Sequence, residues 1–192
     1  GLNDRFVIMY SGNHSPSNPL RTLLDAAVRL KDDATIRFLF VGGGSGKKEV
    51  ETYIREHNLT NAMSLPYQPL AELRYSLGAA DVHVVSLGQD MVGIIHPCKI
   101  YGAMAVGRPI LYFGPRPSHI TDLLDRHDFG VTVPHGDVDG AVAAIRGFRG
   151  ADAAVLRNKG NEARILLERD LSQSILCAGF CDRLEEALSA PR

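Results

Sequence analysis

Short apolar runs alternate with amphipathic segments along about the first 150 residues. The apolar runs are continuous, as in strands buried on both faces of a parallel sheet. Between them, apolar residues recur three and four positions apart, as on the buried side of a helix. The expected strands span 5–12, 35–44, 61–67, 81–87, 108–114 and 130–134. The expected helices span 19–31, 47–59, 70–80, 97–107, 119–128 and 138–148, and two more lie within 151–189.

This alternation predicts an α/β fold, a doubly wound, Rossmann-like parallel sheet of about six strands followed by two C-terminal helices. Folds of this kind bind their ligands beyond the carboxyl ends of the strands. We therefore expect the functional residues in the loops that follow the strands.

Composition narrows the function classes. The chain has 192 residues, of which 45% are hydrophobic, and a net charge of −1 without any long basic run. This balance argues against a general nucleic-acid binder, and the apolar runs are too short to predict a membrane span. Three cysteines without a framework spacing indicate reduced thiols and a cytoplasmic protein. Cys177 and Cys181, four residues apart on an expected helix, indicate helix packing rather than a metal site.

The glycine-rich segment 42–48 follows the second strand. It lacks the spacing of a P-loop, because Lys48 stands where serine or threonine would follow the lysine, and it also fails the dinucleotide fingerprint. Two interpretations stay open: a flexible turn from strand to helix, and a backbone that a ligand can approach closely.

Lys99 lies in the first turn of the helix expected at 97–107. A cation there opposes the helix dipole unless an anion is bound between it and the first-turn N–H groups. Gly102, one turn further on, is expected to leave space beside the lysine. A bound diphosphate explains this arrangement, and a solvated lysine is the alternative.

Four motifs in order resemble the C-terminal, donor-binding domain of GT-B glycosyltransferases, over about residues 5–188. They read "YSGNHSPSNPLRTLLDAA", "RFLFVGGGSGKKEVE", "SLPYQPLAELRYSLGAADVHVVSL" and "PCKIYGAMAVGRPIL". They are most similar to the large retaining group that assembles bacterial surface polysaccharides. The resemblance implies a UDP- or GDP-sugar donor, held without a metal or other cofactor, and transfer of a hexosyl or N-acetylhexosaminyl group.

The resemblance also implies roles for individual residues. Lys99 would pair with the diphosphate and, with the helix N-terminus, stabilise the leaving group as the glycosidic bond breaks. Asp90 is the second implied catalytic residue. Residues 90–95 would surround the donor sugar and phosphate. The implied donor-binding residues are Gly12, Asn13, His14, Gly42, Gly43, Gly44, Tyr67, Gln68, Met91, Val92, Gly93, Ile94, Ile95 and Cys98.

The sequence departs from the family pattern at several positions. Gly102 stands where many members have a glutamate that binds the ribose. Ser15 and Asn18 stand where many relatives have a second glycine and a basic residue or histidine. For His14, a donor contact and a surface side chain both stay open, and surface exposure is favoured. Of the other histidines, His83 is expected to be packed or at a sheet edge, and His96, just before the lysine helix, is a possible donor contact.

GT-B enzymes have two domains, so the resemblance implies an acceptor-binding N-terminal domain outside residues 1–192. The isolated domain would be inactive, and the full-length enzyme could associate with the inner face of the membrane. A sugar-nucleotide epimerase of the same architecture and a non-catalytic nucleotide-binding module stay open as alternatives. Apolar positions on the two last helices would face the other domain and be partly exposed here: Ile165, Leu166, Ile175, Leu176, Phe180 and Leu184.

Overall fold

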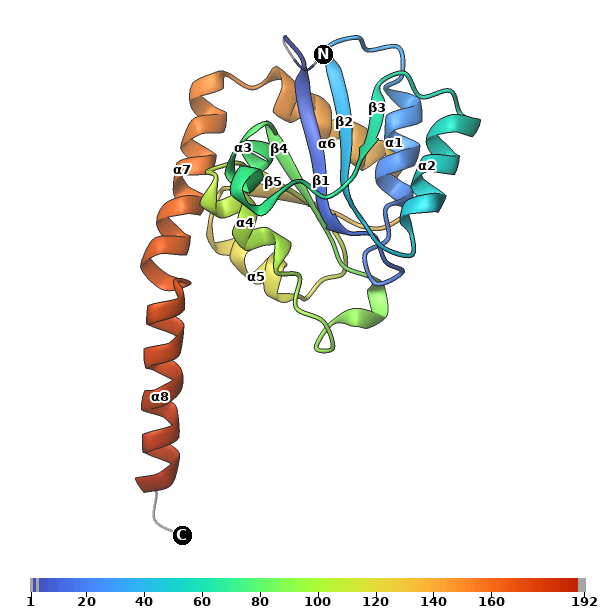
Figure 1. Cartoon of the computed structure of the whole chain (residues 1–192). Helices are drawn as coiled ribbons and strands as arrows, with labels where there is room; N and C mark the ends of the chain where they lie inside the picture. Colours follow the sequence, from blue (N-terminus) through green and yellow to red (C-terminus); the bar gives the residue numbers. More distant parts are fainter. Residues whose placement is uncertain (1, 3, 190–192) are drawn as a thin grey trace.

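The computed structural model describes residues 2 and 4–189. A six-stranded parallel sheet forms its centre, in the order β3-β2-β1-β4-β5-β6 (Figure 1). The expected sheet is therefore confirmed. The strands are β1 (Phe6–Asn13), β2 (Ile36–Gly43), β3 (Ala62–Leu65), β4 (Val82–Ser86), β5 (Ile110–Phe113) and β6 (Gly130–Val133).

Helices cover both faces of the sheet. Apolar residues of α1, α2 and α6 pack on one face, and those of α4, α5 and α7 pack on the other. The helices are α1 (Arg21–Arg29), α2 (Lys47–Glu56), α3 (Leu73–Gly78), α4 (Lys99–Ala105), α5 (His119–Arg126), α6 (Val138–Gly150), α7 (Ala153–Asp170) and α8 (Gln173–Ser189). Two short 3₁₀ turns, η1 (Leu70–Glu72) and η2 (Gln89–Met91), precede α3 and α4.

The helix expected at 70–80 is interrupted. Its first turn is the 3₁₀ turn η1, and α3 follows it at once. Neither segment contains a buried residue, so little packing energy is available to hold a longer regular helix in place.

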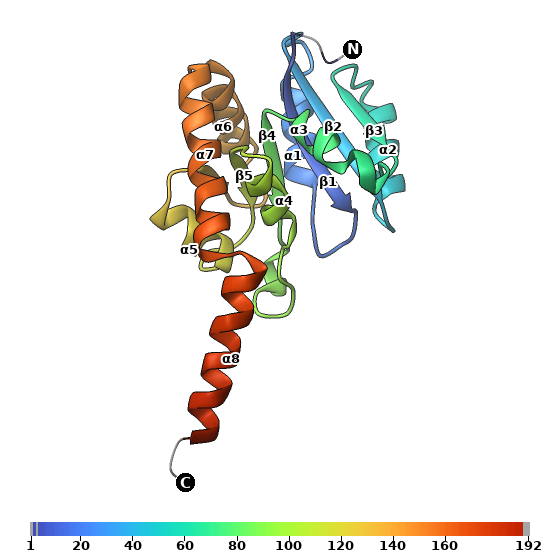
Figure 2. The same ribbon diagram turned by 60° about the vertical axis from the view of Figure 1, so that its left-hand side comes forward.

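The last helix, α8, projects away from the body of the domain, beyond the edge where the strands end (Figures 1 and 2). None of its described residues is buried. Cys177 and Cys181 are exposed, so the prediction that they pack within the chain is wrong. No helix among the described residues is long and apolar enough to cross a membrane.

Most of the apolar positions expected to be exposed on the last two helices are indeed exposed: Ile165, Ile175, Leu176, Phe180 and Leu184. Leu166 is the exception, because it is buried with Met104 and Leu123 in the core between α4, α5 and α7.

The position of a ligand crevice follows from the strand order. β1 and β4 are neighbours, but α1 and α4 pack on opposite faces of the sheet. The loops that follow these two strands therefore diverge, and such a switch point is where doubly wound folds bind ligands.

Candidate functional site

The β1–α1 loop contacts the end of β4 at the switch point, before the two segments lead on to opposite faces of the sheet. The Gly88 N–H donates a hydrogen bond to the Ser17 carbonyl over 2.8 Å. The Ser86 hydroxyl donates to the Pro19 carbonyl over 2.6 Å. These two bonds hold the β1–α1 loop against the end of β4, so the crevice has a fixed wall.

Lys99 is the first residue of α4, and its side chain runs back toward β1. A Cβ added at Gly12 would lie 2.5 Å from Lys99 Cε, so the glycine makes room for the lysine. Nζ donates to Asn18 Oδ1 over 3.3 Å and lies 5.3 Å from the centre of the Tyr10 ring.

The Lys99 ammonium is partly buried, and within the described part of the chain it forms no ion pair. Burial lowers its pKa from the ordinary lysine value. A desolvated cation without a counter-ion is costly to maintain. This position therefore favours an anionic ligand.

Gly102 does not lie beside the lysine. A Cβ at Gly102 would meet Leu77 Cδ1 of α3 at 3.4 Å and, among the described residues, nothing else within 4 Å. The expectation that Gly102 leaves space beside Lys99 is therefore wrong. Residues three apart on a helix point about 60° apart, and the long lysine side chain leans toward β1 while Gly102 faces α3.

Gly42, at the end of β2, and Gly44, just after it, pack against the end of β1 and the loop that follows it. A Cβ on Gly42 would overlap the Gly12 carbonyl, and a Cβ on Gly44 would overlap Asn13 and the His14 carbonyl. Gly42 and Gly44 have φ of +132° and +119°, which side chains rarely adopt. These two glycines therefore allow the β1–α1 and β2–α2 loops to approach closely.

The ring of Tyr67 packs against the backbone of Gly43. A Cβ at Gly43 would lie 3.0 Å from Tyr67 Cε2. The tyrosine side chain is exposed. Gln68, next to it, donates from Nε2 to the Pro66 carbonyl over 3.0 Å. An exposed aromatic ring at the rim of the crevice provides a surface on which a flat ring system can stack.

Lys47, the other lysine near these loops, has a structural role. Its Nζ donates to the carbonyl oxygens of Gly42 and Leu65, each over 2.7 Å, and lies 3.8 Å from Glu51. It ties the end of β2 to the end of β3. Its donors are therefore already occupied, in contrast to those of Lys99.

His14 is buried, with 1% of its surface exposed, so the expected surface location is wrong. Its Nδ1 lies 3.1 Å from the Gly12 carbonyl oxygen and 3.3 Å from that of Gly43. Because both partners are acceptors, Nδ1 carries the proton and donates. Nε2 is buried without a partner in the described structure. Burial is the main cause that lowers the pKa of His14.

Asp90 lies exposed in η2. Within the described residues it forms neither an ion pair nor a side-chain hydrogen bond, and none joins it to Lys99. Cys98 is exposed, and its thiol donates to the His96 carbonyl over 3.4 Å. The exposed residues of the same loop include Val92, Gly93, Ile94 and Ile95.

A cavity of about 300 Å³ lies between the β4–α4 loop and the start of α5. Beside it, the His96 Nε2 lies 2.6 Å from the Tyr101 hydroxyl, which is 3.4 Å from the His119 Nε2. The sequence indicated His96 but not Tyr101 or His119, because their meeting depends on how α4 and α5 pack.

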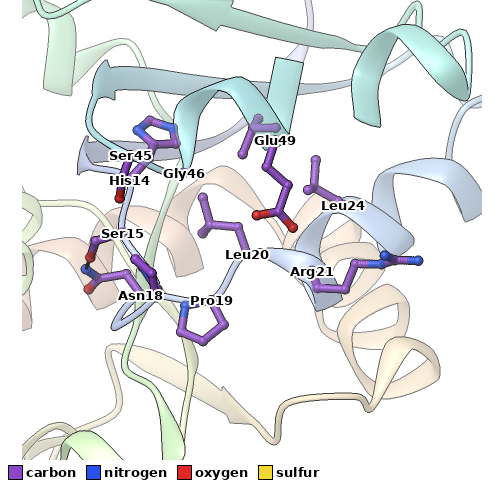
Figure 3. A pocket seen from close by; sticks show the side chains of 12 residues that line it. His14, Ser15, Asn18, Pro19, Leu20, Arg21, Leu24, Ser45, Gly46 and Glu49 are labelled. Atoms are coloured by element: carbon purple, nitrogen blue, oxygen red, sulfur yellow. Dashed lines mark hydrogen bonds between the residues drawn. The ribbon is translucent and has the colours of Figure 1, made fainter. Parts of the chain in front are cut away.

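A second cavity, of about 320 Å³, opens between the β1–α1 loop and α2 (Figure 3). Glu49 of α2 points toward Leu20 at the start of α1. His14, Ser15 and Asn18 belong to both this cavity wall and the loop beside Lys99. The described residues contain no cluster of three or more side chains suited to a metal ion.

Comparison with known proteins identifies the family. The sequence profile "Glycosyl transferases group 1" matches residues 5–148, which is most of the chain. The chain belongs to this family. Among its relatives, WbjE of Pseudomonas aeruginosa, named as a glycosyltransferase, is 27% identical over 183 residues, covering 95% of this chain and 45% of WbjE. WcaI of Escherichia coli K12, named for colanic acid biosynthesis, is 28% identical over 175 residues. The match covers 91% of this chain and 42% of WcaI.

Solved structures of other proteins share the fold of this chain. The C-terminal domain of the group 1 protein LpcC from Francisella tularensis has a TM-score of 0.67 at 15% identity, covering 88% of this chain and 87% of that domain. HepE of Anabaena, solved with UDP-glucose, has a TM-score of 0.77 at 16% identity. The match covers 96% of this chain and 50% of HepE. The expected GT-B C-terminal domain fold is thus confirmed.

The chain spans less than half the length of the two curated relatives.

Proposed function

We propose that this group 1 glycosyltransferase domain binds the nucleoside diphosphate sugar that donates a glycosyl group in polysaccharide or glycolipid assembly. The observation that carries the proposal is Lys99, a partly buried ammonium at the switch point of the sheet that has no acidic partner among the described residues. A diphosphate supplies the negative charge that this position lacks.

The chemistry assigned to Lys99 is electrostatic. Negative charge accumulates on the diphosphate as the glycosidic bond breaks, and a fixed cation stabilises that charge in the transition state. Removing a charged donor of this kind costs about 1.5–3 kcal/mol, so we expect a rate loss of about 10- to 100-fold. Asp90 is proposed as the second catalytic residue. Its exposed position leaves it free to contact a sugar above the loop.

The nucleoside is assigned to the surface around Tyr67. The exposed ring above Gly43 offers a stacking partner for the base. Gly102 supplies no carboxylate for the ribose, so the base and the phosphates carry the recognition. Because HepE was solved with UDP and with UDP-glucose, UDP is the first nucleotide to test, with GDP as the alternative.

The acceptor is assigned to a second domain. The relatives are more than twice as long as the matched region. The exposed apolar residues of α8, including Phe180 and Leu184, offer a surface for that domain to cover.

The test is product analysis with the full-length enzyme that contains this domain. We expect it to release UDP or GDP from a nucleotide sugar and transfer the sugar to a polysaccharide or lipid acceptor. Lys99→Met keeps the aliphatic stem and removes the charge, and should lower kcat about 10- to 100-fold. Lys48→Ala, at an exposed lysine of α2, is the control and should keep the activity.

An altered nucleotide sugar formed without an acceptor would indicate an epimerase and contradict the proposal. Full activity in Lys99→Met would contradict the role of the lysine.

A further inference from the structure

We propose that Asn18 is a positioning residue that orients the Lys99 ammonium through a neutral acceptor, and so leaves the charge of the lysine available to an anionic ligand. The inference deepens the proposed function and rests on it for the identity of that ligand.

Hydrogen bonds fix the orientation of the Asn18 amide. Asn18 is buried, with 7% of the residue exposed. Its Nδ2 donates to Ser15 Oγ over 2.8 Å, and Ser15 Oγ is in turn hydrogen-bonded to Ser17 Oγ over 2.8 Å. Oδ1 is therefore the atom that faces Lys99 Nζ, at 3.3 Å. An ammonium group has no acceptor, so only this orientation of the amide satisfies both partners.

The backbone around Asn18 is held on both sides. The carbonyl of Ser17 accepts from the Gly88 N–H, and the carbonyl of Pro19 accepts from the Ser86 hydroxyl. The Asn18 N–H donates to the Ser15 carbonyl over 2.9 Å. Asn18 is thus fixed to the end of β4, and the group that faces Lys99 is held by the sheet rather than by a mobile loop.

The neutrality of the amide is the decisive property. An aspartate at this position would form an ion pair with Lys99 at a partly buried site, where such a pair is strong. The pair would cancel the charge of the lysine and place a carboxylate where a phosphate approaches. Asparagine supplies an acceptor of almost the same shape without that charge.

The first test measures the pKa of Lys99 in this 192-residue chain by NMR of its Nζ or Cε, assigned with Lys99→Arg. Asn18→Asp should raise this pKa well above the wild-type value, because the new carboxylate stabilises the ammonium. Asn18→Ala should leave it at or below the wild-type value. An unchanged Lys99 pKa in Asn18→Asp would overturn the inference, whatever nucleotide the chain binds.

The second test compares UDP with uridine by NMR titration at neutral pH. Asn18→Asp should weaken UDP binding at least about tenfold and leave uridine binding unchanged, since uridine has no phosphate to be repelled. Gln89→Glu adds the same charge in the exposed η2 turn and controls for general repulsion. Gln89→Glu should lower the affinity for UDP less than Asn18→Asp does.

The outcomes separate the two claims. If Asn18→Asp weakens UDP and uridine equally, the residue has only a structural role and the inference is overturned. If the Lys99 pKa rises as expected but the wild-type chain binds neither UDP nor GDP, the pairing is supported and the proposed function is contradicted.

Discussion

His83 shows how a single residue links this fold to pH. It lies in the interior of the sheet on β4, 4% exposed, and its Nε2 is 2.9 Å from the Leu77 carbonyl oxygen. Nε2 therefore carries the proton and donates. Burial lowers the pKa of His83 to about 4. The expectation that His83 is packed is confirmed.

This pKa predicts acid destabilisation. In the unfolded chain the His83 pKa is about 6.5, so below that pH the unfolded state binds a proton that the folded state does not. The free energy of unfolding should fall by up to about 1.4 kcal/mol per pH unit between pH 6.5 and 4, roughly 3 kcal/mol in all. Urea unfolding at several pH values measures this slope.

His83→Gln should flatten the slope, while His57→Gln, at an exposed histidine, should retain it. A residual slope in His83→Gln is expected from His14, whose pKa is lowered in the same direction. Equal slopes in the wild type and His83→Gln would contradict this account.

At the scale of elements, the strands and helices follow from local pattern, but the contacts between loops do not. The apolar run 5–12 predicted β1 almost to its ends because burial on both faces leaves a continuous apolar signal. The burial of His14 and the contact between Lys99 and Asn18 depend on residues 29 and 81 positions apart. His14 and Asn18 lie in a polar segment that resembles a surface loop. The sequence therefore predicted that Lys99 lies in the first turn of its helix, but not which residues it contacts.

Glycines in two elements should respond oppositely to alanine. Gly102→Ala should stabilise α4 by about 0.5–1 kcal/mol, because the position is helical and a methyl group there makes an ordinary contact with Leu77. Gly42→Ala should destabilise the chain by more than about 1 kcal/mol, because its φ is positive and its Cβ would overlap the Gly12 carbonyl.

Thermal or urea unfolding of both variants measures these effects. Stabilisation by Gly42→Ala would show that the two loops can separate without cost, and would contradict the role assigned to that glycine. Destabilisation by Gly102→Ala would show that Leu77 cannot accommodate the methyl group.

At the scale of the whole molecule, the proposed donor-binding residues gather along one edge of the domain. The crevice with Lys99, the exposed Tyr67 and the projecting α8 all belong to the side where the strands end. The sequence predicted this edge, because the expected doubly wound sheet binds ligands beyond the carboxyl ends of its strands. The strand order in the structure then locates the switch between β1 and β4. The exposure of apolar residues on α8 was expected only from the family resemblance, since a helix with exposed apolar residues and a packed helix have similar sequences.

The central claim is that Lys99 binds the diphosphate of a donor nucleotide at this edge. Titrating the chain and Lys99→Met with uridine, UMP and UDP tests it most directly. The affinity of the wild type should rise from uridine to UDP. In Lys99→Met this rise should be smaller by about 10- to 100-fold, equivalent to about 1.5–3 kcal/mol. The affinity of Lys99→Met for uridine should equal that of the wild type. An unchanged gain from uridine to UDP in Lys99→Met would contradict the claim.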